Sequence, residues 1–148
     1  MKLPKVNTPI MAGLVFGICV LLGAAVVQET VRDLARQGGI DPWVLLAVPG
    51  LFAMLFALIV YQGADQRVTS ISKSLSRGLL VALLTWMSFS ALATWVWCLP
   101  ENYGSCYGNV MLLSGVAGGG PMLAAALIAA AIVGWLIQHR AKSWVAKE

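Results

Sequence analysis

Two of the three cysteines, Cys98 and Cys106, are the residues whose type and spacing most directly indicate chemistry. They flank a short polar segment between two apolar runs, and in an oxidising compartment such a pair favours a structural disulfide. A redox-active pair is the alternative. It is the weaker one, because the spacing is not Cys-x-x-Cys and the sequence holds no second pair to relay electrons. Cys19 lies inside an apolar run, where we interpret it as a small packing residue.

The sequence offers few residues for acid–base or metal chemistry. His139 is the only histidine, and one histidine cannot build a metal site without companions. Apart from Cys19, Tyr61 and the already named Cys98, no ionisable side chain lies inside the apolar runs. Proton pumps, ion-coupled carriers and intramembrane enzymes usually need such a group. We therefore expect no enzyme activity, no catalytic residue, no metal and no cofactor.

Small residues recur at a spacing of four in two of the apolar runs. Because such faces let helix backbones approach closely, we interpret five of them as helix-packing positions: Gly13, Gly17, Ala126, Ala130 and Gly134. Other small or polar residues could contact a solute, although packing is their commoner use. These candidates are Ser90, Thr94, Gly118, Gly119 and Gly120.

The composition indicates a membrane protein. Hydrophobic residues make up 59% of the 148 residues and charged residues 11%, whereas soluble domains carry about 25% charged residues. Four apolar runs are long enough to cross a hydrocarbon core of ~30 Å; they lie at residues 9–27, 43–61, 79–99 and 110–137. Lipid cannot satisfy exposed backbone polar groups, so these runs must be helices. The sequence thus predicts a single all-α polytopic domain over residues 1–148, with its first run retained rather than cleaved as a signal peptide.

Local signals refine the ends of these helices. Asp41 can cap the second helix, with Pro42 at its first position. The fourth run contains Gly118-Gly119-Gly120-Pro121, which disfavours a continuous helix. We expect either a break, with residues 110–117 as a separate short segment, or one kinked helix. The two alternatives stay open at this point.

The connections between the runs also carry helical patterns. Residues 28–38 combine an apolar face with charged sides, so the first helix is expected to continue outward as an amphipathic helix. Val68, Ile71 and Leu75 repeat at spacings of three and four, which predicts a short helix lying on the membrane interface.

Basic residues predict the orientation. Every Lys and Arg except Arg32 and Arg36 falls in the two tails or in the loop over residues 62–78. Positive-inside bias then places both termini and this loop in the cytoplasm, and it explains the net charge of +4 without a nucleic-acid partner. Most tryptophans fall near helix ends, but Trp86 lies deeper and needs an interior partner for its indole N–H. The charge bias and the outer cysteine pair suit a bacterial inner membrane and, nearly as well, a eukaryotic endomembrane; the compact loops favour the bacterial one.

These patterns leave three functional hypotheses. The first is an accessory, assembly or immunity-type subunit that packs against another membrane protein, because its helices are uncharged and its soluble parts are small. The second is a homo-oligomeric channel or small-solute carrier that uses the glycine-rich break of the fourth helix. The third, a thiol enzyme at Cys98 and Cys106, is the weakest. The partners expected are the lipid bilayer and another membrane protein or a second copy of the chain.

Overall fold

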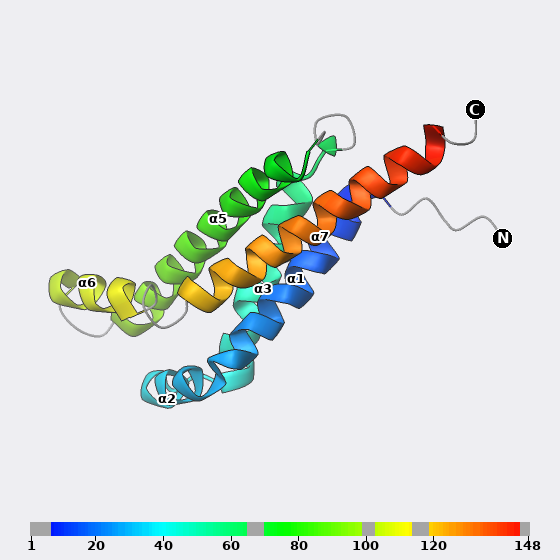
Figure 1. Cartoon of the computed structure of the whole chain (residues 1–148). Helices are drawn as coiled ribbons and strands as arrows, with labels where there is room; N and C mark the ends of the chain where they lie inside the picture. The colour runs from blue at the N-terminus through cyan, green and yellow to red at the C-terminus, as the bar shows by residue number, and fades with distance from the viewer. Residues whose placement is uncertain (1–6, 65–69, 99–102, 114–118, 146–148) are drawn as a thin grey trace.

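The computed structural model describes residues 7–64, 70–98, 103–113 and 119–145. Within these residues all regular structure is helical (Figure 1). The helices, in chain order, are α1 (Thr8–Val26), α2 (Gln28–Gly38), α3 (Pro42–Val60), α5 (Ile71–Cys98), α6 (Tyr103–Leu113) and α7 (Gly119–Val145).

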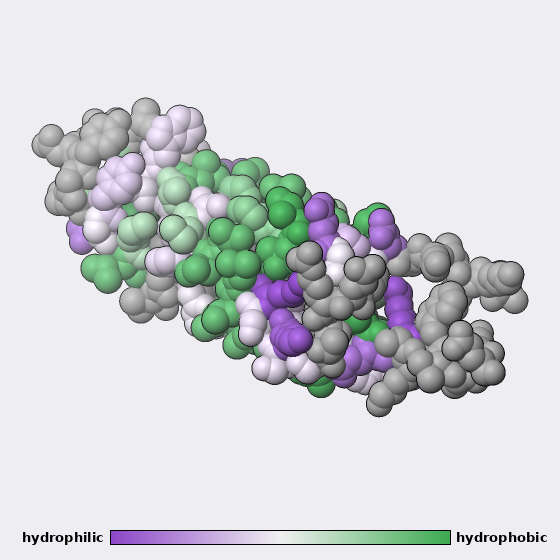
Figure 2. All heavy atoms as spheres, turned by 90° about the horizontal axis from the view of Figure 1, so that it is seen from above, coloured by the Kyte–Doolittle hydropathy of each residue, from purple (hydrophilic) through white to green (hydrophobic). Residues whose placement is uncertain are grey.

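Four of these helices are long and apolar enough to cross a membrane, which confirms the prediction of a multi-pass membrane protein. The spans are Thr8–Val26, Pro42–Val60, Ile71–Trp95 and Gly119–Arg140. Figure 2 shows hydrophobic residues covering the middle of the molecule and hydrophilic residues gathered towards its ends. An apolar middle between more polar ends suits a protein that crosses a bilayer.

The first two spans lie within one residue of the predicted ones, whereas the last two differ. The third begins at Ile71, so Ile71 and Leu75 belong to the first turns of α5 and not to a separate surface helix. The fourth begins at Gly119 and its helix continues past residue 137, because the polar residues that follow extend the same helix. Residues 110–113, predicted to start this span, belong to α6 instead. The residues between α6 and α7 lie outside the described part, so the predicted break or kink remains a prediction.

The start of α3 follows from local chemistry. The Asp41 carboxylate accepts a hydrogen bond from the Trp43 backbone N–H at 2.9 Å, and Pro42 occupies the first helical position. Both features were predicted from the sequence. Just before them, α2 ends at Gly38 and is followed by Gly39, whose φ of 64° lies in the left-handed region that glycine adopts most easily.

The four long helices form one bundle. The principal contacts are α1 with α3 and α7, and α5 with α7 and α3. α1 begins and α7 ends at the same end of the bundle, while α2 and α6 lie towards the other end (Figure 1). The core between the helices consists mainly of small side chains with a few larger ones, such as Phe16, Tyr61 and Val133.

Candidate functional site

The interface between α5 and α7 pairs residues at a regular spacing. The two helices run antiparallel, and facing positions step by four residues along each of them. On α5 the series is Ser74, Gly78, Ala82 and Trp86; on α7 it is Gly134, Ala130, Ala126 and Met122. The side chains are therefore small at one end of the interface and large at the other. We call these the narrow end, at Ser74 and Gly134, and the wide end, at Trp86 and Met122.

At the narrow end the backbones touch. A Cβ added to Gly134 would lie 2.7 Å from the Ser74 Cβ, and one added to Gly78 would overlap the Ala130 Cβ. No side chain larger than hydrogen fits at either glycine without moving a helix. The close approach allows dispersion contacts between the backbones themselves.

The polar groups of the narrow end are paired across three helices. The Ser74 hydroxyl donates to the Ala130 carbonyl at 2.7 Å. The Tyr61 hydroxyl lies 3.1 Å from that same Ser74 oxygen and donates to the Ser74 carbonyl at 3.0 Å. Arg77 donates to the Val60 carbonyl at 3.0 Å. Because Tyr61 and Ser74 are fully buried, these bonds avoid the cost of unpaired polar groups in an apolar medium.

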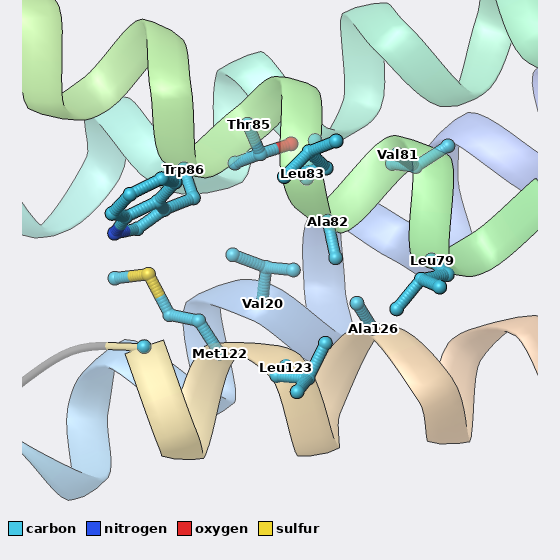
Figure 3. Close-up of a pocket in the computed structure, with 12 residues that line it drawn as sticks. Val20, Leu79, Val81, Ala82, Leu83, Thr85, Trp86, Met122, Leu123 and Ala126 are labelled. Atoms are coloured by element: carbon cyan, nitrogen blue, oxygen red, sulfur yellow. The ribbon is translucent and has the colours of Figure 1, made fainter. Parts of the chain in front are cut away.

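At the wide end a cavity of about 390 Å³ opens between the helices. Trp86 of α5 and Met122 of α7 face each other across it, and Val20 of α1 lies between the two helices (Figure 3). The remaining lining residues are nearly all aliphatic: Ala53, Leu79, Val81, Ala82, Leu83, Thr85, Gly119, Leu123 and Ala126. The volume lies within the range of about 300–1,000 Å³ typical of small-molecule sites.

Two of the residues that line this cavity carry a buried polar atom without a partner among the described residues. The Thr85 hydroxyl and the Trp86 indole nitrogen are both buried, and neither has a hydrogen-bond partner in the described part of the chain. Thr85 is only 4% exposed. The interior partner that the sequence predicted for Trp86 is thus not found among the described residues. Such groups usually cost about 1–3 kcal/mol each when unpaired in an apolar interior.

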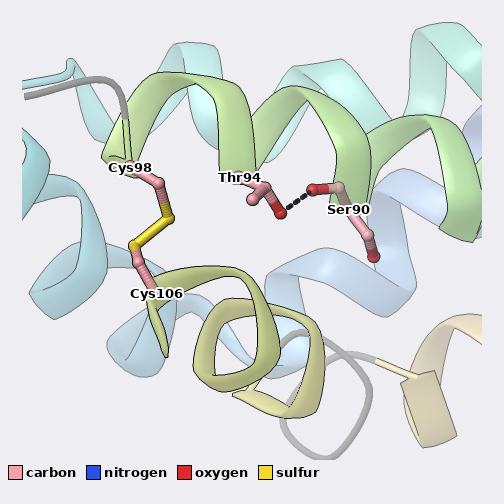
Figure 4. Close-up of a disulfide and its surroundings, with 4 residues drawn as sticks. All are labelled: Ser90, Thr94, Cys98 and Cys106. Atoms are coloured by element: carbon pink, nitrogen blue, oxygen red, sulfur yellow. Dashed lines mark hydrogen bonds between the residues drawn. A yellow bond between two sulfur atoms is a disulfide. The ribbon is translucent and has the colours of Figure 1, made fainter. Parts of the chain in front are cut away.

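A disulfide joins Cys98 at the end of α5 to Cys106 of α6, as the sequence predicted (Figure 4). The two Cα atoms are 5.8 Å apart. α6 packs chiefly against α5, so this bond ties α6 to the bundle beyond the wide end of the interface. Cys19 remains a free thiol within α1.

The predicted helix-packing residues all lie against neighbouring helices of the same chain. A Cβ on Gly13 would lie 3.0 Å from Leu58, and Gly17 faces Met54. Ala126, Ala130 and Gly134 face α5 and are all buried. Packing against a partner must therefore use other surfaces.

The predicted solute contacts are not brought together. Only Gly119 lines the cavity. Gly120 is exposed, and Gly118 lies outside the described residues. Ser90 and Thr94 are buried nearer the disulfide, where the Thr94 hydroxyl donates to the Ser90 carbonyl at 2.6 Å (Figure 4).

Sequence reasoning missed Ser74, Tyr61 and Thr85. Ser74 falls in the loop predicted over residues 62–78, and the sequence marks Tyr61 only as an ionisable residue at the end of an apolar run. The signal that could have found them is the series of small residues at a spacing of four on α5 and α7. This series can be recognised only when it is known which residues of the two helices face each other. The described residues contain no group of His, Cys, Asp or Glu able to hold a metal ion.

Comparison with protein-family models, with curated proteins and with solved structures gave no match to this chain.

Proposed function

We propose that this protein is a non-enzymatic interaction subunit that acts through contact with another membrane protein. The proposal rests on the position and the exposed apolar side chains of α6. This helix projects from the bundle and is held by the Cys98–Cys106 disulfide (Figure 1). It exposes Tyr107, Met111 and Leu112, the last with 67% of its surface open. Ordering an exposed apolar helix with a covalent bond lowers the entropy cost of binding a partner there.

The proposal includes an orientation. Positive-inside bias supports placing the chain ends and the α3–α5 connection in the cytoplasm, with α2 and α6 on the outer side. The disulfide fits an oxidising outer space, such as the periplasm that borders a bacterial inner membrane. Partners on the outer side would then meet α6 first.

Site-specific photocrosslinking tests the proposal. A photoreactive amino acid at Leu112, introduced in native membranes, is expected to capture one second protein in near-stoichiometric yield. The matched control places the same amino acid at Ile128, which is 58% exposed on the bundle surface, and is expected to capture lipid. Capture of lipid alone at both positions contradicts the proposal.

A homo-oligomeric channel or small-solute carrier is the second candidate, and the position of Gly119 at the cavity favours it. A Cβ at Gly119 meets no atom of the described residues within 4 Å, so Gly119→Leu adds bulk beside the cavity without a clash against those residues. Self-crosslinks from Leu112, together with liposome flux of an apolar solute that Gly119→Leu reduces, would support this candidate. A folded oligomer without flux would reject it.

A further inference from the structure

We infer that Lys73 and Arg77, near the start of α5, bind the headgroup of an anionic phospholipid. We call these two residues the basic pair. The inference goes beyond the proposed partner contact at α6, which lies towards the other end of the molecule (Figure 1). It rests on a guanidinium that is held in place with most of its donors unused, on a second cation beside it, and on the charges that surround them.

Arg77 is half-buried and fixed against the end of α3. Its guanidinium donates to the Val60 carbonyl at 3.0 Å and lies over the Tyr61 ring, 5.9 Å from the ring centroid. Val60 is the last residue of α3, so its carbonyl has no amide partner within the helix. Because these contacts already orient the Arg77 side chain, a ligand that binds to it costs little further side-chain entropy.

Most of the hydrogen-bonding capacity of Arg77 is unused in the described part of the chain. A guanidinium carries five N–H donors in a planar fork, and the Val60 carbonyl takes one of them. No carboxylate of the described residues forms an ion pair with Arg77. The planar fork matches a phosphate group, which it can bind through two parallel hydrogen bonds.

Lys73 adds a second positive charge on the same side of α5. It lies four residues before Arg77, a spacing that places two side chains next to each other on a helix. The Lys73 side chain is exposed, so its ammonium is accessible to a ligand. Two like charges at this spacing repel each other, and an anion bound to both removes that repulsion.

The acidic side chains of the described residues lie at the other end of the molecule. All three of them, Glu29, Asp33 and Asp41, belong to α2 or directly precede α3. Charges of both signs are mixed there, and Asp33 lies 3.9 Å from Arg36. The basic pair has no such compensation among the described residues. Charge complementarity therefore favours an anionic ligand at the basic pair.

The depth of the basic pair favours a lipid as the source of the anion. Arg77 contacts the last residue of the span Pro42–Val60, so its guanidinium lies where the hydrocarbon core meets the headgroups. Basic residues between transmembrane helices at this level bind anionic headgroups. Leu80, Leu84 and Met87 continue the same side of α5 at spacings of three and four, and all are at least partly exposed. This apolar stripe suits the acyl chains of the bound lipid, whereas a free phosphate would leave it uncovered.

Two lipids with the same acyl chains test the inference. Dioleoyl phosphatidylglycerol carries a net negative charge, whereas dioleoyl phosphatidylcholine is neutral overall. Each lipid is titrated into the full chain in detergent micelles, and bound lipid is counted by native mass spectrometry. We expect the first phosphatidylglycerol to bind roughly 25-fold more tightly than the first phosphatidylcholine, which is about fivefold for each of the two basic residues.

Variants locate the bound headgroup. Lys73→Gln and Arg77→Gln each remove one charge, and each should lower the preference for phosphatidylglycerol about fivefold. Because Lys73 is exposed, Lys73→Gln keeps the test decisive if loss of the Arg77 contact with α3 impairs folding. The control is Arg36→Gln, which removes the same charge from a side chain that is 78% exposed at the other end of the molecule. It should leave the preference unchanged.

Three results would overturn the inference. The first is equal binding of the two lipids, and the second is a preference that neither Lys73→Gln nor Arg77→Gln reduces. The third comes from inorganic phosphate added at the concentration of the lipid. It should not displace phosphatidylglycerol, because it lacks acyl chains; displacement would show that the basic pair takes free phosphate and not a lipid.

Discussion

The narrow and wide ends of the α5–α7 interface are built on the same four-residue spacing and differ only in the size of the residues placed on it. At the narrow end Gly78 and Gly134 bring the backbones into contact, and Ser74 joins both helices to Tyr61. At the wide end Trp86 and Met122 hold the helices apart around a cavity. The two ends therefore have different roles. The narrow end holds α5 and α7 together, and the wide end leaves a cavity and two donors without partners among the described residues.

The physics of the membrane interior explains why the bundle is stable although one end of the α5–α7 interface contains a cavity. Lipid is as apolar as the helix surfaces, so the hydrophobic effect does not hold the helices to one another. Close packing and hydrogen bonds must do so. Between α5 and α7 both are concentrated at the narrow end, and α1 packs closely against α3 and α7 as well. The bundle can then tolerate a cavity and unpaired donors elsewhere, at a cost of a few kcal/mol for the two donors together.

The largest expected effect is that of Gly78→Leu at the narrow end. The added side chain would overlap Ala130 and force the helices apart, so we expect the bundle to lose about 3 kcal/mol of unfolding free energy. Steric trapping in bicelles measures this free energy. Gly119→Leu is the matched control, since a Cβ there lies more than 4 Å from every atom of the described residues outside its immediate surroundings in the chain. Equal destabilisation by both variants would remove the distinction between the two ends.

A double-mutant cycle on Ser74 and Tyr61 should give the next largest effect. Ser74→Ala removes the hydroxyl that both Ala130 and Tyr61 contact, and we expect it to cost about 1–2 kcal/mol. Adding Tyr61→Phe to it should cost less than Tyr61→Phe alone costs in the wild type, because the two hydroxyls share one network. Additive losses would mean that the network does not act as a unit. Ser76→Ala, at an exposed hydroxyl bonded within its own helix turn, is the control.

Filling the wide end should have a small effect on stability. Ala82 points toward α7 beside the cavity (Figure 3), so Ala82→Leu places extra carbons in open space. We expect a change within about 1 kcal/mol, measured in the same assay. The matched variant Ala130→Leu makes the same substitution at the narrow end and should be several-fold more costly. The reverse order would contradict the assignment of the two ends.

Removing the disulfide should affect stability least. In Cys98→Ser/Cys106→Ser, α6 loses its link to α5, but the narrow end lies at the opposite end of α5. We expect the unfolding free energy of the bundle to change by less than about 0.5 kcal/mol, because the effect is a local release. Faster hydrogen exchange confined to α6 would show that release. A bundle-wide loss of protection would show instead that α6 supports the long helices.

The sequence predicted the elements that depend on local chemistry. The apolar runs indicated four spans, Asp41 and Pro42 predicted the start of α3, and the spacing of Cys98 and Cys106 predicted their disulfide. In each case the deciding interactions lie within a few residues or between the chain and its solvent. The small residues were recognised as packing positions, but the sequence could not show which helix each one faces.

The candidate site depended on contacts between distant segments. Ser74 belongs to α5 and bonds to Ala130, 56 residues away, so nothing near Ser74 distinguishes it from a surface serine. The cavity arises because Trp86 and Met122 meet in the register that Gly78 and Ala130 impose. The sequence predicted that the Trp86 indole N–H needs an interior partner, and the described residues supply none.

The most direct test of the account is the indole N–H resonance of Trp86 in the full chain, labelled with ¹⁵N-tryptophan in lipid nanodiscs. The chain contains six tryptophans, and Trp86→Phe assigns the signal. We expect the Trp86 proton to resonate upfield, as an unbonded N–H does. A Trp86 proton that resonates downfield, as a hydrogen-bonded N–H does, would contradict the unpaired donor at the wide end.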